Sequence, residues 1–173
     1  CKKGYAQEGD SCVPCPLQEY QNEDSEAYCK TCPAGKYTVT LGSTDVSDCT
    51  SCIPGYIKVS TSDGFECSVC DAGKYNDSPS SSFSDQCQDC VTGRYLTDAA
   101  LDGSEHNAAS KCLACPIGYK SLDTRARCEI CGFSKYQDEE GENNCKSCPT
   151  GQQAATPGAT DMSECIICEP GRI

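Results

Sequence analysis

The sequence is poor in the side chains that build an ordinary hydrophobic core. Val, Leu, Ile and Phe together number 22 of 173 residues, Trp is absent, and Met162 is the only methionine. This share, about 13%, lies well below the roughly 20% under which a highly charged chain is expected to stay disordered. No apolar run approaches the roughly 20 residues that a membrane-spanning helix needs. Composition therefore excludes a conventional globular core and predicts no membrane insertion within this segment.

Basic side chains are also scarce, and there is almost no histidine. The chain has 14 Lys and Arg against 26 Asp and Glu, a net charge of -12. Nucleic acids are held by clustered Lys and Arg, which are scattered here, so we expect no nucleic-acid partner. The single histidine, His106, falls in the polar segment LTDAALDGSEHNAASK, where we expect a solvated loop residue rather than a ligand or a catalytic base.

Cysteine, in contrast, is abundant. The chain has 19 cysteines, about 11% of its residues, a density typical of disulfide scaffolds in an oxidising compartment. A disulfide that closes a loop of about 15 residues stabilises a fold by roughly 3 kcal/mol in the chain-entropy model. We therefore expect disulfides to replace the missing core, and an extracellular or cell-surface location.

The cysteines are regularly spaced. After Cys1, every one belongs to a CxxC pair, and the stretches between pairs hold 13, 16, 14, 16, 21, 12, 13 and 16 residues. Cys1 opens CKKGY, which matches CIPGY and CPIGY further along, so we expect it to be the second half of a pair that begins upstream. This regularity indicates tandem repeats.

A longer period lies above the single loop. Openings of the form C-x-x-G-Y and C-x-x-x-[KRE]-Y recur every three loops, and residues 15–57 align without a gap on 131–173. The period predicts repeat units at 1–51, 52–114 and 115–167, with 168–173 beginning another. Stacked repeats that contact only their neighbours form an elongated tandem array of cysteine-rich modules.

Two disulfide pairing schemes fit the series of CxxC pairs. In the sequential scheme, the second Cys of each pair bonds to the first Cys of the next pair. In the other scheme, consecutive CxxC pairs interlock first to first and second to second, as in 29 to 49 with 32 to 52. Interlocking would give equivalent loops inequivalent bonds under a three-loop period, so we favour the sequential scheme. The sequential bonds are Cys1 to Cys12, Cys15 to Cys29, Cys32 to Cys49, Cys52 to Cys67, Cys70 to Cys87, Cys90 to Cys112, Cys115 to Cys128, Cys131 to Cys145 and Cys148 to Cys165, with Cys168 paired outside the chain.

Metal and catalytic uses of these residues are less favoured. Two CxxC pairs at this spacing lie near that of a zinc ribbon, but nine pairs leave one over and the surface is acidic. The acidic clusters NEDSE (22–26) and DEEGEN (138–143) lack the alternating ligand spacing of a calcium loop. No Ser, Cys and His constellation is available for nucleophilic catalysis. The sequence therefore predicts no enzyme, no metal site and no cofactor.

The loop openings have local structural explanations. Glycine at the third position after Cys permits a positive φ at a tight turn beside the crosslink. The Tyr that follows can lay its ring over a cystine, a structural role favoured over a Tyr-lined ligand surface. Runs such as YTVT and YIKV predict strands of three or four residues. Small hairpins and turns should dominate, with almost no helix, in a disulfide-rich and mostly irregular fold.

One modification motif is present. Asn76-Asp77-Ser78 is an N-x-S sequon beside SPSSSFS, which predicts glycosylation of Asn76 in a surface loop if the protein is secreted. Glycans are therefore possible partners.

The segments CPAGKYTVTLGSTDVSDCTSCIPGY and SKYQDEEGENNCKSCPTGQQAATPGATDMSEC carry the elements C-P-x-G-x-Y, G-[AS]-T-D-x-S-[DE]-C and CxxC. Together these resemble the ephrin receptor-like cysteine-rich repeats, relatives of tumour necrosis factor receptor and growth-factor receptor modules. The resemblance covers nearly the whole chain. It implies an extracellular, elongated, disulfide-linked rod without catalytic residues, and it fixes no ligand.

Two functions are compatible with these observations. The favoured one is a structural segment of a larger extracellular protein, such as a rod, stalk or filament, with partners among its own copies or neighbouring repeats. The alternative is a receptor ectodomain that binds a protein ligand, which would require an exposed aromatic or Arg cluster. Only the insertion at 91–111 is irregular enough in sequence to host such a cluster.

Overall fold

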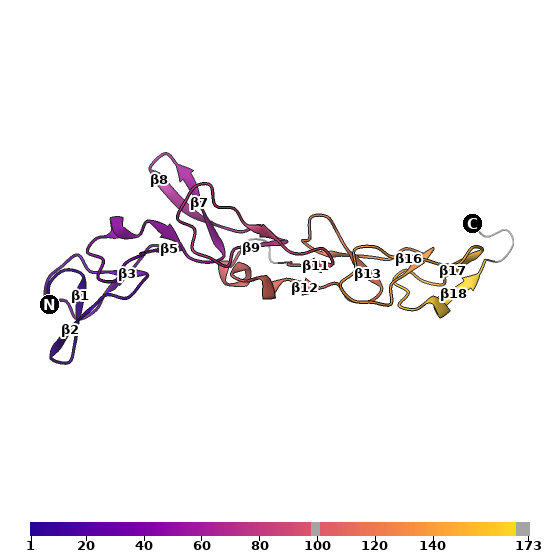
Figure 1. The fold of residues 1–173 in the computed structure, drawn as a ribbon, viewed down its shortest axis with the longest axis horizontal. Coiled ribbons are helices and arrows are strands. Elements are labelled where there is room, and N and C mark those ends of the chain that lie inside the picture. The colour runs from indigo at the N-terminus through magenta and orange to yellow at the C-terminus, as the bar shows by residue number, and fades with distance from the viewer. Residues whose placement is uncertain (98–100, 169–173) are drawn as a thin grey trace. The chain divides into compact units, whose positions relative to one another are not determined.

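The computed structural model describes residues 1–97 and 101–168, and there the chain folds as successive two-stranded hairpins joined by turns (Figure 1). In this part of the chain all nine hairpins are antiparallel, four short stretches are 3-10 helix, and no α-helix is present. The expected fold class is confirmed: a small, disulfide-rich, mostly irregular fold of tandem modules with short β-hairpins.

The chain forms two compact units. Unit 1 comprises Cys1–Cys70, Asn76–Cys87 and Asp102–Asn107, and unit 2 comprises Asp71–Tyr75, Gln88–Leu101 and Ala108–Ile173. The threefold division at 51 and 114 follows the sequence repeat rather than these units, and stays a prediction. The expected start of a further repeat at 168–173 lies, after Cys168, outside the described residues.

The elements of unit 1 are four hairpins and two 3-10 turns. The hairpins pair β1 (Tyr5–Glu8) with β2 (Ser11–Pro14), β3 (Glu19–Tyr20) with β4 (Lys30–Thr31), β5 (Lys36–Tyr37) with β6 (Ser51–Cys52), and β7 (Tyr56–Thr61) with β8 (Gly64–Val69), and the 3-10 turns are η1 (Val46–Asp48) and η2 (Gly103–His106). The β7–β8 hairpin is the longest of the described hairpins, with six paired positions.

Unit 2 continues the series with five hairpins. They pair β9 (Lys74–Tyr75) with β10 (Gln88–Asp89), β11 (Arg94–Tyr95) with β12 (Leu113–Ala114), β13 (Tyr119–Ser121) with β14 (Cys128–Ile130), β15 (Lys135–Tyr136) with β16 (Lys146–Ser147), and β17 (Gln152–Ala154) with β18 (Cys165–Ile167), and the 3-10 turns are η3 (Ala109–Lys111) and η4 (Met162–Glu164).

A tight turn opens most of these hairpins. Ahead of β5, the backbone N–H of Lys36 donates to the carbonyl of Pro33 at 2.9 Å, and Gly35 between them has φ +74°. A turn with positive φ at its third residue is a type II turn, which favours glycine there. This explains why glycine recurs at the third position after Cys.

Cystines occupy the interior of both units. Apart from ten cysteines, the buried apolar residues of the described chain are Ala6, Leu96, Ala154 and Ala159. The one cluster with a larger side chain lies in unit 2, where Leu96 packs with Cys90 and Cys112 and against Tyr75. The interior is too small to stabilise the fold without its crosslinks.

Loops are also hydrogen-bonded to the loop that follows them along the chain. In unit 1 the N–H of Gly4 donates to the carbonyl of Gln21 at 2.8 Å, and the N–H of Gln21 donates to the carbonyl of Ser43 at 3.0 Å. The same relay recurs at Gly55, Asn76 and His106, at Gly73, Leu96 and Arg125, and at Gly118, Gln137 and Ala159. Successive loops are therefore joined by backbone bonds as well as by sulfur.

Candidate functional site

The disulfide ladder is the main chemical feature of the chain. It links each CxxC pair to the next with Cα–Cα distances of 5.3 to 5.9 Å, within the usual range for a disulfide. The bonds are Cys1–Cys12, Cys15–Cys29, Cys32–Cys49, Cys52–Cys67, Cys70–Cys87, Cys90–Cys112, Cys115–Cys128, Cys131–Cys145 and Cys148–Cys165. This is the sequential scheme, so the interlocked alternative is wrong.

Cys168 forms no disulfide in the described part of the chain and is partly exposed. It occupies the second position of its CxxC pair, where Cys1, Cys15 and the other equivalent cysteines bond to the following loop. Its pairing outside the chain stays a prediction.

Buried glutamines hold the acidic loops of both units. The side chain of Gln21 donates from Nε2 to the carbonyl of Tyr28 and accepts at Oε1 from the N–H of Glu23 at 3.1 Å. Gln137 repeats this arrangement in unit 2, donating to the carbonyl of Asn144 and accepting from the N–H of Glu139 at 3.1 Å. Each buried amide is thereby satisfied, as a group removed from water must be.

Carboxylates close the second half of the aligned loops. In the motif G-[AS]-T-D-x-S-[DE]-C, Asp161 accepts from the N–H of Ser163 at 2.7 Å and caps η4. Glu164 accepts from the N–H of Asp161 at 3.2 Å, which completes a capping box, and also from the N–H of Thr160 at 2.8 Å. Hydrogen bonds from Ser163 lower the pKa of Asp161, and hydrogen bonds from Thr160 lower the pKa of Glu164.

His106 is not the solvated loop residue that the sequence predicts. Its side chain is fully buried at the end of η2, and its backbone carbonyl accepts from the N–H of Asn76 at 2.8 Å. The 3-10 turn η2 begins at Gly103, which packs so closely against the ring of Tyr56 that it leaves no room for a Cβ. The prediction of a solvated His106, made from the polar composition of the segment, was therefore wrong.

Asn76 is buried as well. Its amide donates to the carbonyl of Tyr56 at 2.9 Å, and its side-chain oxygen accepts from the N–H of Ser78 at 3.4 Å. Glycosylation occurs on the same amide nitrogen, so a glycan would have to be attached before this loop folds. The modification stays a prediction.

The acidic clusters are engaged in ion pairs. Glu23 bonds to Lys30 at 2.8 Å in unit 1, and the hydrogen bond from Lys30 lowers the pKa of Glu23. In unit 2, Lys146 reaches Asp138 at 2.6 Å and Glu139 at 3.3 Å. Among the residues that the structure describes, no group of three or more His, Cys, Asp or Glu side chains is arranged to hold a metal ion.

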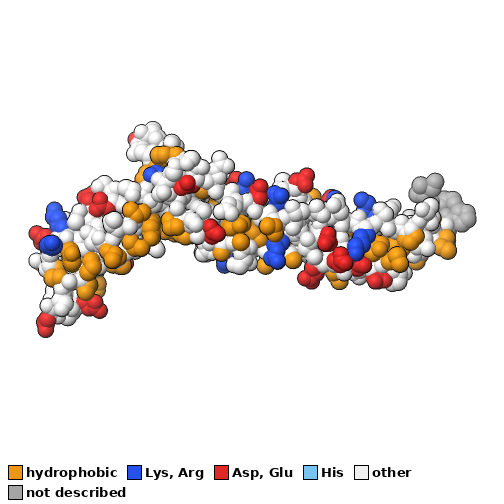
Figure 2. Space-filling model, in the orientation of Figure 1, with side chains coloured by type: hydrophobic (Ala, Val, Ile, Leu, Met, Phe, Trp, Pro, Cys, Tyr) orange, Lys and Arg blue, Asp and Glu red, His pale blue; other side chains and the backbone are white. Residues whose placement is uncertain are grey.

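Hydrophobic side chains are displayed at the surface in many places. Figure 2 shows them among acidic groups on one face of the molecule. The most exposed aromatic among the described residues is Tyr28, at 83%, on the acidic loop of unit 1, and Phe133 of unit 2 is 55% exposed. Within 1–97 and 101–168, no helix is long and apolar enough to cross a membrane.

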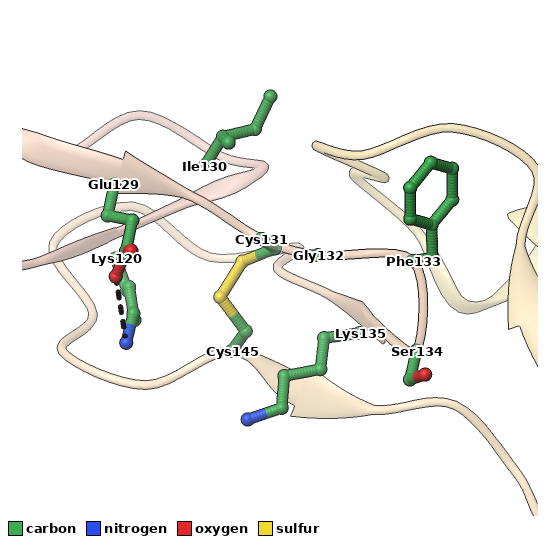
Figure 3. Close-up of a pocket in the computed structure, with 9 residues that line it drawn as sticks. All are labelled: Lys120, Glu129, Ile130, Cys131, Gly132, Phe133, Ser134, Lys135 and Cys145. Atoms are coloured by element: carbon green, nitrogen blue, oxygen red, sulfur yellow. Dashed lines mark ion pairs between the residues drawn. A yellow bond between two sulfur atoms is a disulfide. The ribbon is translucent and has the colours of Figure 1, made fainter.

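Unit 2 contains an open crevice of about 490 Å³ beside the Cys131–Cys145 disulfide. Figure 3 shows its lining, with Ile130 and Phe133 standing at one side of the Cys131–Gly132 backbone and an ion pair between Lys120 and Glu129 at the other. The distance between Lys120 Nζ and Glu129 Oε2 is 3.1 Å. Sequence reasoning pointed to 91–111 for an irregular surface and missed this crevice, because its side chains come from two successive loops and the segment that joins them.

Sequential disulfides, two-stranded hairpins and backbone hydrogen bonds between successive loops define the chain as a tandem array of small cysteine-rich modules. A family model described as "Tyrosine-protein kinase ephrin type A/B receptor-like" matches residues 4–49 and 118–165, more than half of the chain. The chain belongs to this ephrin receptor-like family of cysteine-rich repeats, as the resemblance of its motifs indicated.

Relatives of this segment occur within larger proteins. A mouse "Sushi, von Willebrand factor type A, EGF and pentraxin domain-containing protein 1" is 30% identical over 93% of this chain, and the match spans 4% of that protein. A mouse "Signal peptide, CUB and EGF-like domain-containing protein 2" is 28% identical over 95% of this chain and 16% of its own length. The chain therefore corresponds to a small part of these multidomain relatives.

Proposed function

We propose that the chain is a structural, non-enzymatic repeat segment of a larger extracellular protein, where it acts as a crosslinked spacer. The observation that carries this proposal is the double connection between loops: disulfides join consecutive cysteine pairs, and backbone hydrogen bonds link loops to the loop that follows them. Such a segment resists unfolding without needing a core.

Three further features support the proposal. The buried polar side chains of Gln21 and Gln137 bind the chain's own backbone rather than facing an open cleft. Nine disulfides are typical of an oxidising compartment. The matched relatives are long proteins whose names combine several domain types, and this segment is a minor share of their length.

A segment exchange tests the proposal. In the full-length protein that carries this chain, the segment is replaced by the aligned region of the mouse relatives, which preserves the repeat pattern but changes about 70% of the side chains. A spacer predicts that the chimaera is secreted and keeps the binding partners of the parent protein.

The competing function is a receptor ectodomain, and the same experiment separates the two. If the chimaera is secreted with its disulfides formed but loses a protein partner that the isolated 173-residue chain binds, the spacer proposal is overturned. Non-reducing peptide mapping of both proteins confirms that the exchange has preserved the pairing before partners are compared.

A further inference from the structure

The crevice of unit 2 is lined by side chains that differ from those at the aligned positions of unit 1. The hairpins β3–β4 and β15–β16 have equivalent registers, with Glu19 opposite Thr31 and Lys135 opposite Ser147. Phe133 and Lys135 occupy the positions of Leu17 and Glu19 in the aligned copy. Because both sequences form the same hairpin, the fold does not require an aromatic ring and a lysine there.

The side chains that differ are available for contact. Phe133 and Ile130 are 55% and 46% exposed, and both line the crevice. Lys135 is exposed and forms no ion pair in the described part of the chain, whereas Lys120 is already paired with Glu129. A partner that fits must therefore present an apolar or aromatic side chain close to a carboxylate.

This chain itself carries a surface with that chemistry. The acidic loop, defined here as residues 22–28, ends at Tyr28, the ring exposed at 83%, and Glu26 two residues earlier is exposed. The hydrogen bond from the Gln21 side chain to the carbonyl of Tyr28 fixes the loop. Lys30 forms its ion pair with Glu23, so the carboxylate of Glu26 is available to contact a partner. A preorganised loop loses less entropy when it binds.

We propose that the crevice of one copy binds the acidic loop of a second copy, with Tyr28 against Ile130 and Phe133 and Glu26 facing Lys135. The inference rests on the proposed structural function and names its partner. The two faces differ, so the contact is head-to-tail and leaves one crevice and one acidic loop open at the ends of each dimer. At an ionic strength of about 0.15 M the Debye length is about 8 Å, so repulsion between chains of charge -12 is screened more than the contact pair.

Charge reversal on the two faces tests the proposal. The unreduced 173-residue chain is followed by sedimentation velocity over a range of concentrations at about 0.15 M ionic strength. We expect the wild type to associate as concentration rises, and Lys135→Glu and Glu26→Lys, each alone, to weaken association by about tenfold or more. Mixing the two variants should restore it, since one supplies an intact loop and the other an intact crevice.

Glu19→Lys, at the aligned position of unit 1, is the matched control and should leave association unchanged. Peptide mapping under non-reducing conditions establishes that each variant keeps the nine bonds. The proposal is overturned if the wild type is monomeric at every concentration, if neither reversal weakens association, or if the mixture associates no better than either variant alone. A monomeric wild type beside a functional segment chimaera would remove this inference and leave the spacer proposal standing.

Discussion

Residues 15–49 of unit 1 and 131–165 of unit 2 are two copies of one backbone with different surfaces. Both contain a Gln clamp, at Gln21 and Gln137, and both end in a capped 3-10 turn before the closing cysteine. The outward side chains diverge, as at Glu19 and Lys135. The comparison teaches that the repeat specifies inward polar contacts and turns, while its outer face is free to acquire binding properties.

The first test of this comparison replaces the glycines at which two loops come into contact. A Cβ on Gly118 would lie 2.5 Å from the carbonyl oxygen of Gly158, and one on Gly4 in unit 1 would lie 2.3 Å from that of Gly42. Gly151 has a similar φ of +81° but nothing within 4 Å of the same position. Alanine at each of the three positions should lower the free energy of unfolding by about 1 kcal/mol, because the backbone there is left-handed.

Gly4→Ala and Gly118→Ala should cost roughly 2 kcal/mol more than Gly151→Ala, because backbone must also move away from the new methyl. Urea unfolding of the unreduced chain, monitored by hydrogen exchange and mass spectrometry, measures the loss of unfolding free energy for each unit separately. Equal losses for Gly118→Ala and Gly151→Ala would show that the loop contact contributes nothing beyond the turn.

The second test is at the two clamps. Replacing Gln137 by Leu leaves the carbonyl of Asn144 and the N–H of Glu139 without the side-chain partners they now have, and should lower the free energy of unfolding by about 2 kcal/mol. Gln21→Leu should cost a similar amount in unit 1. Gln86→Leu, at an exposed position, is the control. Protection of the acidic loops from hydrogen exchange reports the effect, and unchanged protection in both clamp variants would contradict it.

Much of this architecture could be predicted from cysteine spacing. The CxxC pairs and the three-loop period gave the sequential bonds and the hairpins, since a covalent ladder constrains the chain wherever its cysteines lie. The YTVT strand prediction was wrong beyond Tyr37. Thr38 is buried, and its hydroxyl accepts from the N–H of Gln18 at 3.0 Å, so the chain leaves the hairpin there.

The contacts between loops could not be predicted in the same way. His106 is buried because of loops that precede it by many residues, and the relay from Gly55 through Asn76 to His106 has no local sequence signal. Once the relay is known, a signal can be seen in retrospect: the sixth residue after a loop-opening cysteine is buried at Gln21, Thr38, Asn76 and Gln137. A polar residue at that position is predicted to lie at the surface until its backbone partners are known.

The third and smallest effect is expected in acid, and it sharpens the comparison of the capped turns. Hydrogen bonds from Ser47 lower the pKa of Asp45 in unit 1, as those from Ser163 and Thr160 lower the pKa values of Asp161 and Glu164 in unit 2. A carboxylate with a lowered pKa stabilises the folded state above its unfolded pKa, and this contribution is lost as pH falls through the folded value. Both units should therefore lose stability below about pH 4, although the disulfides remain intact.

Within the capped turns, η4 should lose more than η1, since Asp161 and Glu164 both have lowered pKa values. Asp161→Asn and Glu164→Gln should each flatten the acid limb of the stability curve of unit 2 and leave that of unit 1 unchanged. Hydrogen exchange of the two capped turns, measured between about pH 3 and pH 7 and corrected for the intrinsic exchange rate, makes the comparison. Glu140→Gln, at an exposed position outside the capped turns, is the control. An acid limb that stays equally steep in all three variants would place the pH dependence elsewhere than in the caps.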